Sequence, residues 1–394
     1  MKNSVNDVMD FVKEEDVKFI RLAFCDAEGK IRNASIMPGE LENAFKNGVS
    51  FDASAVGFGK VENSDLFLFP DPDTLTLLPW RPSHGRVIRL FCDIKYPDGT
   101  PFELDSRNVL KNAVAYAARN GITCNFGTEF EFYLFKLDEN GEKTRIPCDN
   151  AGYMDVAPDD KGENIRREIC LTIEEMGLSP ECSHHEEGPG QNEIDFKYSD
   201  ALSSADHAVI FRNATETISY KNGLWASFDP KPLPDKSGSG MHVNVSVISE
   251  KGEDVFDSFV AGVLKEVKNM TYFLNKTEQS YLRLGEMKAP SSVCWGNSNR
   301  SALIRIPASK TGKRFEMRSP DGKANVYLVY ALIIYAGVEG VKNKLILPAE
   351  QKENAFGIAG GDSELLPDSL NAARELAENS KFIGKFLDEK FITG

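Results

Sequence analysis

The sequence predicts an α+β protein with a small N-terminal domain and a large C-terminal domain. Its 394 residues exceed the usual size of a single domain. Predicted strands come in runs, and helices are interspersed among them irregularly, which favours α+β over a doubly wound parallel sheet. We place the boundary near residue 100, which gives domains of residues 1–100 and 101–394.

The first hundred residues read as a compact unit of strands and helices. Residues 17–25 alternate as a strand, and a second strand follows after a turn. Pro38 opens a helix that Gly48 closes. Ser106 can cap the first helix of the C-terminal domain.

The larger domain mixes long helices with strands. We expect helices near residues 107–119, 161–176, 203–222, 256–275, 324–345 and 367–389. We expect strands near residues 123–135, 192–198, 241–247, 302–306 and 313–318.

Composition excludes several classes of protein. The formal charge of -14 argues against nucleic acid or an anionic membrane as the main partner. The seven cysteines include no C-x-x-C pair, which is typical of reduced thiols in a cytoplasmic protein. The longest apolar stretch, residues 326–337, is too short to cross a bilayer.

Three predicted strands carry charged or polar residues on one face only. Residues i and i+2 of a strand share a face, so Glu129 and Glu131 lie opposite Phe130 and Phe132. The polar faces of the other two strands carry His242, Asn244, Ser246, Arg314, Glu316 and Arg318. A solvated face explains any one such strand, but the repetition indicates a water-filled, metal-binding cavity.

The segment HHEEGPGQNEI adds two carboxylates to this set. Its Gly-Pro-Gly sequence at 188–190 forces a turn, so Glu186 and Glu193 can fold back toward each other. A loop or core role accounts for at least one of His184 and His185. A hard, oxygen-rich set suits Mg²⁺ or Mn²⁺. The predicted ligands are Glu129, Glu131, Glu186, Glu193, His242 and Glu316.

Arginines are concentrated in a short stretch of this acidic chain. Their planar guanidinium groups match phosphate and carboxylate geometry. They are Arg283, Arg300, Arg305, Arg314 and Arg318. The sequence Ser-Gly-Ser-Gly at 237–240 can also offer backbone N–H groups to an anion. The metals and the arginines together predict a phosphate-handling site.

Taken together, these motifs resemble the glutamine synthetase family, class I, of the short bacterial or archaeal kind. The resemblance runs from about residue 17 to about residue 350 and is specific because its motifs keep one order. They are GTEFEFYLF, HHEEGPGQNEIDFKY, KPLPDKSGSGMHVNVS, SYLRLGEMKAP, NRSALIRIP and RFEMRSPD. The resemblance implies a β-grasp domain, a funnel-shaped catalytic domain, and a homo-oligomeric ring with sites shared between subunits.

The resemblance also implies roles for individual residues, with ATP as co-substrate. One metal would be held by Glu131, Glu186 and Glu193, and the other by Glu129, His242 and Glu316. Glutamate would be bound by Arg283, Arg318 and Gly238. The transferring phosphate and ATP would contact Arg300, Arg305 and Arg314, with Tyr198 and Ser246 lining the nucleotide pocket.

The amine side of the site departs from the family pattern. The resemblance makes Asp52 of a neighbouring subunit the base for ammonium, with Tyr153 and Glu186 in the same pocket. Lys288 stands where relatives carry a glutamate, and a lysine 4 Å from ammonium costs on the order of 1 to 4 kcal/mol. Glu286 could replace the missing carboxylate if the loop shifts its register.

Other departures concern the N-terminal motif and the end of the chain. Ala53 and Ala55 replace a glycine and a serine that are usual after the aspartate. The chain ends at Gly394, before the tail through which rings stack in relatives. We therefore expect a ring of six subunits with a weakened or missing contact between rings.

Three functions remain open at this point. The first is ligation of glutamate to ammonia. The second is ligation to an organic amine, for which Lys288 and Ala55 are the reasons. The third is a catalytically silent regulatory relative, against which the complete set of metal ligands and arginines argues.

Overall fold

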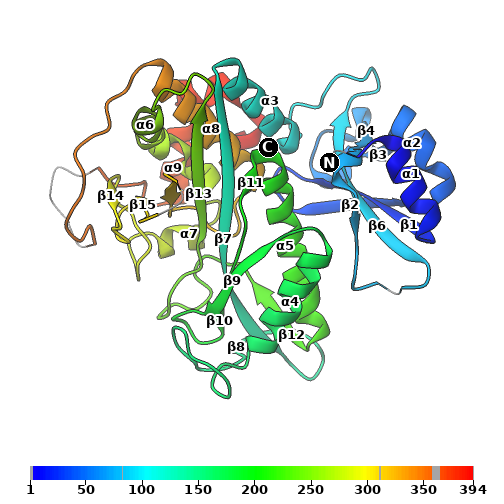
Figure 1. Cartoon of the computed structure of the whole chain (residues 1–394), viewed down its shortest axis with the longest axis horizontal. Coiled ribbons are helices and arrows are strands. Elements are labelled where there is room, and N and C mark those ends of the chain that lie inside the picture. Colours follow the sequence, from blue (N-terminus) through cyan, green and yellow to red (C-terminus); the bar gives the residue numbers. More distant parts are fainter. Residues whose placement is uncertain (1–2, 82, 310–311, 357–363, 394) are drawn as a thin grey trace.

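The computed structural model describes residues 3–81, 83–309, 312–356 and 364–393. Two sheets organise the chain. The N-terminal sheet lies in the unit drawn in blue and cyan, and the larger sheet lies in the remainder of the molecule (Figure 1). Among these residues, no helix is long and apolar enough to span a membrane.

The N-terminal sheet has six strands in the order β2-β1-β6-β4-β3, with β5 paired to β6. Strand β1 runs antiparallel to β2 and parallel to β6. The strands are β1 (Val17–Cys25), β2 (Ile31–Ile36), β3 (Val49–Asp52), β4 (Asp65–Pro70), β5 (Thr76–Leu77) and β6 (Arg86–Lys95). The accompanying α-helices are α1 (Val5–Glu14) and α2 (Leu41–Asn47), and short 3-10 helices include η2 (Ala53–Val56) and η4 (Pro72–Thr74).

The larger sheet has ten strands in the order β14-β15-β16-β13-β7-β10-β9, with β8, β11 and β12 also paired to β7. Its long strands are β7 (Ile122–Leu137) and β13 (Met241–Ser249). The others are β8 (Lys143–Pro147), β9 (Pro180–His185), β10 (Gln191–Phe196), β11 (Ser199–Asp200), β12 (Leu224–Ser227), β14 (Trp295–Asn297), β15 (Ile304–Ile306) and β16 (Phe315–Met317).

The helices of the larger unit are α3 (Ser106–Arg119), α4 (Glu163–Glu175), α5 (Ala201–Lys221), α6 (Phe256–Leu274), α7 (Glu278–Arg283), α8 (Val326–Lys342), α9 (Leu370–Glu378), α10 (Lys381–Phe386) and α11 (Lys390–Thr393). They pack on the apolar face of the larger sheet or, like α9 and α10, on helix α6. Phe130 of β7 stacks on Phe211 of α5 with ring centroids 5.2 Å apart. Phe126 stacks on Tyr330 of α8 at 4.1 Å. Each such buried ring stabilises the fold by about 1.5–3 kcal/mol. Because side chains alternate along a strand, the opposite face of β7 is available to polar residues.

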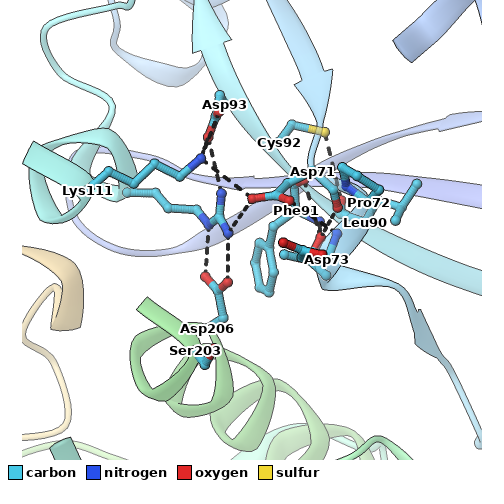
Figure 2. Close-up of polar contacts among 12 residues, drawn as sticks. Asp71, Pro72, Asp73, Leu90, Phe91, Cys92, Asp93, Lys111, Ser203 and Asp206 are labelled. Carbon is cyan, nitrogen blue, oxygen red and sulfur yellow. Dashed lines mark hydrogen bonds and ion pairs between the residues drawn. The ribbon is translucent and has the colours of Figure 1, made fainter. Parts of the chain in front are cut away.

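A buried ion cluster joins the two units. Arg107, the second residue of α3, donates two hydrogen bonds to Asp206 of α5, at 3.0 and 2.9 Å. The same guanidinium group lies 3.0 Å from Asp71 and 3.1 Å from Asp93, both in the N-terminal unit. Lys111 also binds Asp93, at 2.6 Å (Figure 2). This junction fixes the first helix of the large unit to the small sheet.

Most of the predicted elements are present, with corrections at helix ends. The predicted helix over residues 367–389 is wrong as one element: it contains α9 and α10, and α11 begins after it, at Lys390. The break follows Asn379, because the side chain of Ser380 caps a new helix by accepting the N–H of Ile383. Ser106 is not the cap of α3, because the carboxylate of Asp105 accepts the first free N–H groups.

Candidate active site

The polar face of the larger sheet forms one wall of a cavity of about 480 Å³. The cavity is lined almost entirely by charged and polar side chains. Residues predicted from the sequence that line it are Glu129, Glu131, Tyr153, Glu186, Glu193, Gly238, His242, Arg283, Arg300, Arg305, Arg314 and Arg318. Glu316 lies beneath them, buried, in contact with three of these side chains. Metal-binding and anion-binding residue types therefore meet in one place.

Four neighbouring strands supply the central carboxylates and the histidine. Glu129 and Glu131 lie on β7, and His242 of β13 is paired directly with Glu129. The His242 ring lies 3.6 Å from Glu129 and 3.8 Å from Glu131. Glu193 of β10 is paired with Glu131, and Glu316 of β16 lies 3.5 Å from His242. The two-residue repeat of each strand directs all five side chains to the same face.

Glu186 reaches the cavity from the turn between β9 and β10. Its N–H donates to the carbonyl of Gln191 at 2.8 Å, which closes the hairpin around the Gly-Pro-Gly sequence. Its carboxylate oxygen lies 3.0 Å from Nε2 of His184 and can accept a hydrogen bond from that ring. The ligand atoms of His184, Glu186 and Glu193 lie within 4.8 Å of one another, as do those of Glu131, Glu193 and His242. Glu193 therefore connects the two groups.

The electrostatics of this face indicate a shortage of positive charge. Burial and neighbouring carboxylates raise the pKa of Glu193 well above its ordinary value. Burial and the charge of Glu129 raise the pKa of Asp195 to about 7. Burial would raise the pKa of Glu316 as well, but two arginines and His242 outweigh it and lower that pKa to about 2. A divalent cation beside Glu193 would supply the charge that these carboxylates lack.

The arginines line the side of the cavity next to β15 and β16. Arg305 and Arg318 each donate to Glu316, at 2.7 Å, so one carboxylate holds both guanidinium groups in place. Arg283 is only 2% exposed and is held by backbone carbonyls. Within the described part of the chain, the Nε atoms of Arg305 and Arg318 are buried without a hydrogen-bond partner. Free buried donors of this kind are suited to an anionic ligand.

A second cavity of about 900 Å³ adjoins the first. The two share Glu129, Asp195 and Arg314 in their walls. Tyr198 and Ser246 line the second cavity and not the first. The site therefore consists of a charged chamber and a larger chamber of mixed polarity beside it.

Comparison with known families accounts for nearly the whole chain. The profile described as glutamine synthetase, catalytic domain, matches residues 103–394. The profile described as glutamine synthetase, beta-Grasp domain, matches residues 16–97. The chain belongs to the glutamine synthetase family. Its N-terminal sheet is the β-grasp domain of that family, and the ten-stranded sheet belongs to the catalytic domain.

Relatives in the family are similar over most of their length. A glutamine synthetase from Clostridium saccharobutylicum is 43% identical, over 100% of this chain and 94% of the relative. One from Methanosarcina mazei is 42% identical, over 97% of this chain and 90% of the relative. A solved complex of GmaS with ADP is 27% identical, with a TM-score of 0.90 over 98% of this chain and 94% of the other. Plasmodium falciparum glutamine synthetase, at 22% identity over 100% of this chain and 95% of the other, shares the fold with a TM-score of 0.86.

Two residues implied by the family resemblance lie apart from the ligand strands. Asp52 ends β3 in the β-grasp domain and is not among the residues lining either cavity. Its carboxylate accepts the N–H and the hydroxyl of Ser54, at 3.0 and 2.6 Å. Tyr153 lines the charged chamber with its ring edge-on to His184, 5.3 Å between centroids, and is half exposed. Within one chain, Tyr153 reaches the cavity and Asp52 does not.

Sequence reasoning missed several lining residues. Asp195 follows Glu193 by two positions on β10, so the same strand repeat could have identified it. His184 lines the chamber, whereas His185 is fully buried and holds Asp149 at 3.0 Å, which makes it the core histidine of the two. Gln191 also lines the chamber, and no sequence pattern marks it.

The lysine that departs from the family pattern has a partner inside the chain. Lys288 lines the charged chamber and forms an ion pair with Glu187, the residue after Glu186. Glu286 is exposed and is not among the lining residues of the chamber. The lysine charge is therefore balanced by Glu187, and Glu286 does not line the chamber in the place of the missing carboxylate.

Proposed function

We propose that this chain is an ATP-dependent ligase that joins the side-chain carboxylate of glutamate to ammonia through a γ-glutamyl phosphate. The observation that supports this most strongly is the charged chamber, where carboxylates, a histidine and arginines from separate family motifs line one cavity. Relatives 42–43% identical over the whole chain carry the name glutamine synthetase. The chemistry below follows from the residues that line the two chambers.

We assign Mg²⁺ or Mn²⁺ to the carboxylate face. The donor set fits, because the clustered groups on this face offer mostly carboxylate oxygens, together with the imidazoles of His242 and His184. Glu131, Glu186 and Glu193 would hold one ion, and Glu129, His242 and Glu316 the other. When bound, such ions neutralise charge on phosphoryl oxygens. The carboxylates themselves fix where that positive charge lies, because their strands are buried on the opposite face.

Glutamate would bind at the arginine side of the chamber. Arg283 and Arg318, with the backbone of Gly238, present donors to its carboxylates. Arg300, Arg305 and Arg314 would contact the phosphoryl group during transfer. Because Glu316 holds Arg305 and Arg318 before any ligand arrives, these donors need little rearrangement on binding.

ATP would occupy the adjoining chamber, with Tyr198 and Ser246 beside the nucleoside. Arg314 lines both chambers and is placed to meet the phosphates where the two join. A carboxylate is a poor acyl donor, so its oxygen first attacks the γ-phosphorus of ATP, the bond between the γ-phosphorus and the β-phosphate oxygen breaks, and ADP is the leaving group. Ammonia then attacks the acyl carbon, the bond to phosphate breaks, and glutamine and phosphate leave.

Ammonium must lose a proton before it attacks, which is work for a general base. We infer that Asp52 of a neighbouring subunit is that base, beside Tyr153 and Glu186. The support is its position, since Asp52 is exposed on the β-grasp domain and lines neither chamber of its own chain. A homo-oligomeric ring with shared sites, six subunits to a ring, would bring it into place.

Two further inferences concern the location of the protein in the cell and the boundary between its domains. The seven cysteines are free thiols, which supports a cytoplasmic location. We also infer that the two domains divide near residue 100, between the segments matched by the two family profiles.

The test is phosphate release from ATP with Mg²⁺ and glutamate, measured across a panel of amines. We expect release to require both glutamate and an amine, with ammonia as the best acceptor and glutamine as the product. Faster turnover with methylamine or a polyamine would assign the site to an organic amine. Release that is independent of glutamate, or its absence with every amine, would refute the proposal.

A further inference from the structure

The carboxylate of Glu187 connects three separate segments at the edge of the charged chamber. One oxygen forms the ion pair with Lys288, which lies 101 positions further along the chain. The other oxygen accepts a hydrogen bond from the hydroxyl of Ser237 at 3.4 Å. The N–H of Glu187 donates to the carboxylate of Glu186 at 3.1 Å. All four residues line the same chamber.

Among the described residues, the backbone hydrogen bonds of the segment that carries Lys288 stay within it or reach back to the end of α7, where Glu286 donates to Arg283 at 3.1 Å. Residues 285–289 form a tight loop, in which Gly285 donates to the carbonyl of Ala289 and Ala289 donates to Glu286, both at 2.9 Å. Met287 is 53% exposed, and the side chain of Lys288 is 62% exposed. The loop is closed on itself, so the ion pair is its contact with the hairpin opposite.

The backbone of this loop is also unusual. Met287 and Lys288 have φ angles of 43° and 70°, in the left-handed region that residues other than glycine rarely adopt. Such a conformation persists when surrounding contacts hold it. Since Glu187 provides the contact from the opposite side of the chamber, loss of that carboxylate should free the loop.

We infer that Glu187 and Lys288 form a clasp that positions loop 285–289 over the amine side of the chamber and thereby sets the apparent affinity for the amine. The inference rests on the proposed function for the identity of the amine. Glu187 and Lys288 are positioning residues, because their charges neutralise each other and do not contact the substrate. What matters in this arrangement is that the two charges are opposite, not which segment carries which sign.

The test compares Glu187→Gln, Lys288→Gln and the charge swap Glu187→Lys/Lys288→Glu with the unmodified oligomer. Each single variant loses the clasp, so the KM for ammonia should rise about two- to fivefold in both, the range expected of an exposed ion pair. The KM values for ATP and glutamate should stay unchanged. The swap should restore the KM for ammonia. Lys390→Gln, which breaks a similarly exposed pair with Glu103 at the other end of the chain, is the matched control and should change nothing.

Electrostatics acting alone would give a different pattern. Glu187→Gln would leave a free lysine that repels ammonium, and Lys288→Gln would leave a free carboxylate that attracts it, so the two KM changes would have opposite signs. That pattern, or a swap that fails to restore the KM, would overturn the clasp.

A second measurement does not depend on activity. Hydrogen exchange of the backbone amides in 284–289 should accelerate in both single variants and return to the original rate in the swap. Equal exchange in all four proteins would overturn the inference even if ammonia is confirmed as substrate. A protein without ammonia-dependent phosphate release but with the expected exchange would refute only the proposed function.

Discussion

Replacing Arg107 should destabilise the protein more than any change at a surface charge. Arg107 is 4% exposed, and its guanidinium group interacts with carboxylates from both domains. In Arg107→Met, the aliphatic stem is kept and the charge is lost. Asp206, itself 6% exposed, then keeps only the hydroxyl of Tyr327, at 2.7 Å, among the described partners of its carboxylate. Figure 2 shows the carboxylates of Asp71, Asp93 and Asp206 pointing toward the middle of this cluster.

The size of the effect follows from leaving a buried carboxylate without its cation. Removing one partner of a buried ion pair costs about 3–5 kcal/mol, whereas an exposed pair contributes about 0–1 kcal/mol. Lys111→Met is the matched control, because its ammonium group binds Asp93 in the same cluster but is 29% exposed. We expect a loss of about 1 kcal/mol or less for the control.

The measurement is urea unfolding followed by tryptophan fluorescence, at one protein concentration because the chain is proposed to be oligomeric. The double variant Arg107→Met/Asp206→Leu should recover part of the loss, since both charges are then gone. A loss below about 1 kcal/mol in Arg107→Met, or no recovery in the double variant, would refute the reasoning.

Three further predictions test other parts of the structure. Burial would raise the pKa of Glu339, but hydrogen bonds from donors on α3, α8 and α10 outweigh it and lower that pKa to about 2. Glu339→Gln should therefore lower the unfolding free energy at pH 7 by at most about 3 kcal/mol. The difference in stability between this variant and the unmodified protein should vanish as pH falls from about 4.5 toward 2, which urea titrations at several pH values can check. Glu186→Ala should abolish Mn²⁺-dependent phosphate release and weaken Mn²⁺ binding by calorimetry, with an unchanged circular dichroism spectrum. Asp52→Asn and Arg300→Gln should each be inactive alone. Mixed rings assembled from equal amounts should regain about a quarter of full activity, because a quarter of the shared sites contain neither change. Mixed rings without activity would contradict the sharing of sites between subunits.

Much of the ligand face could be predicted because it depends on a local rule. In a strand, every second side chain points the same way, so the sequence alone placed Glu129 with Glu131 and predicted their separation from Phe130 and Phe132. The structure confirms that both phenylalanines are fully buried. Helix α8 could be predicted equally well from the sequence, because most of its residues are apolar on every side of the helix.

Other features depend on contacts between distant segments and could not be predicted. The pairing of Glu187 with Lys288 joins a hairpin to a loop that no periodic pattern places beside it. The break between α9 and α10 depends on Ser380, which caps a new helix inside a stretch that has helical spacing throughout. Asp52 lines neither chamber of its own chain, and local sequence rules do not describe how far the β-grasp domain lies from the ligand strands.

Strand β7 pairs with β8, β10, β11, β12 and β13, and it carries Glu129 and Glu131 at its centre. These backbone bonds can open only if most of the large sheet opens with them, so the amides around Thr128 should be the last in the chain to exchange with solvent. The carboxylates at the centre of the chamber therefore keep their spacing for as long as a molecule is folded at all. Mild denaturant should therefore reduce activity through the unfolding of whole subunits, and not through a gradual change in the spacing of these carboxylates.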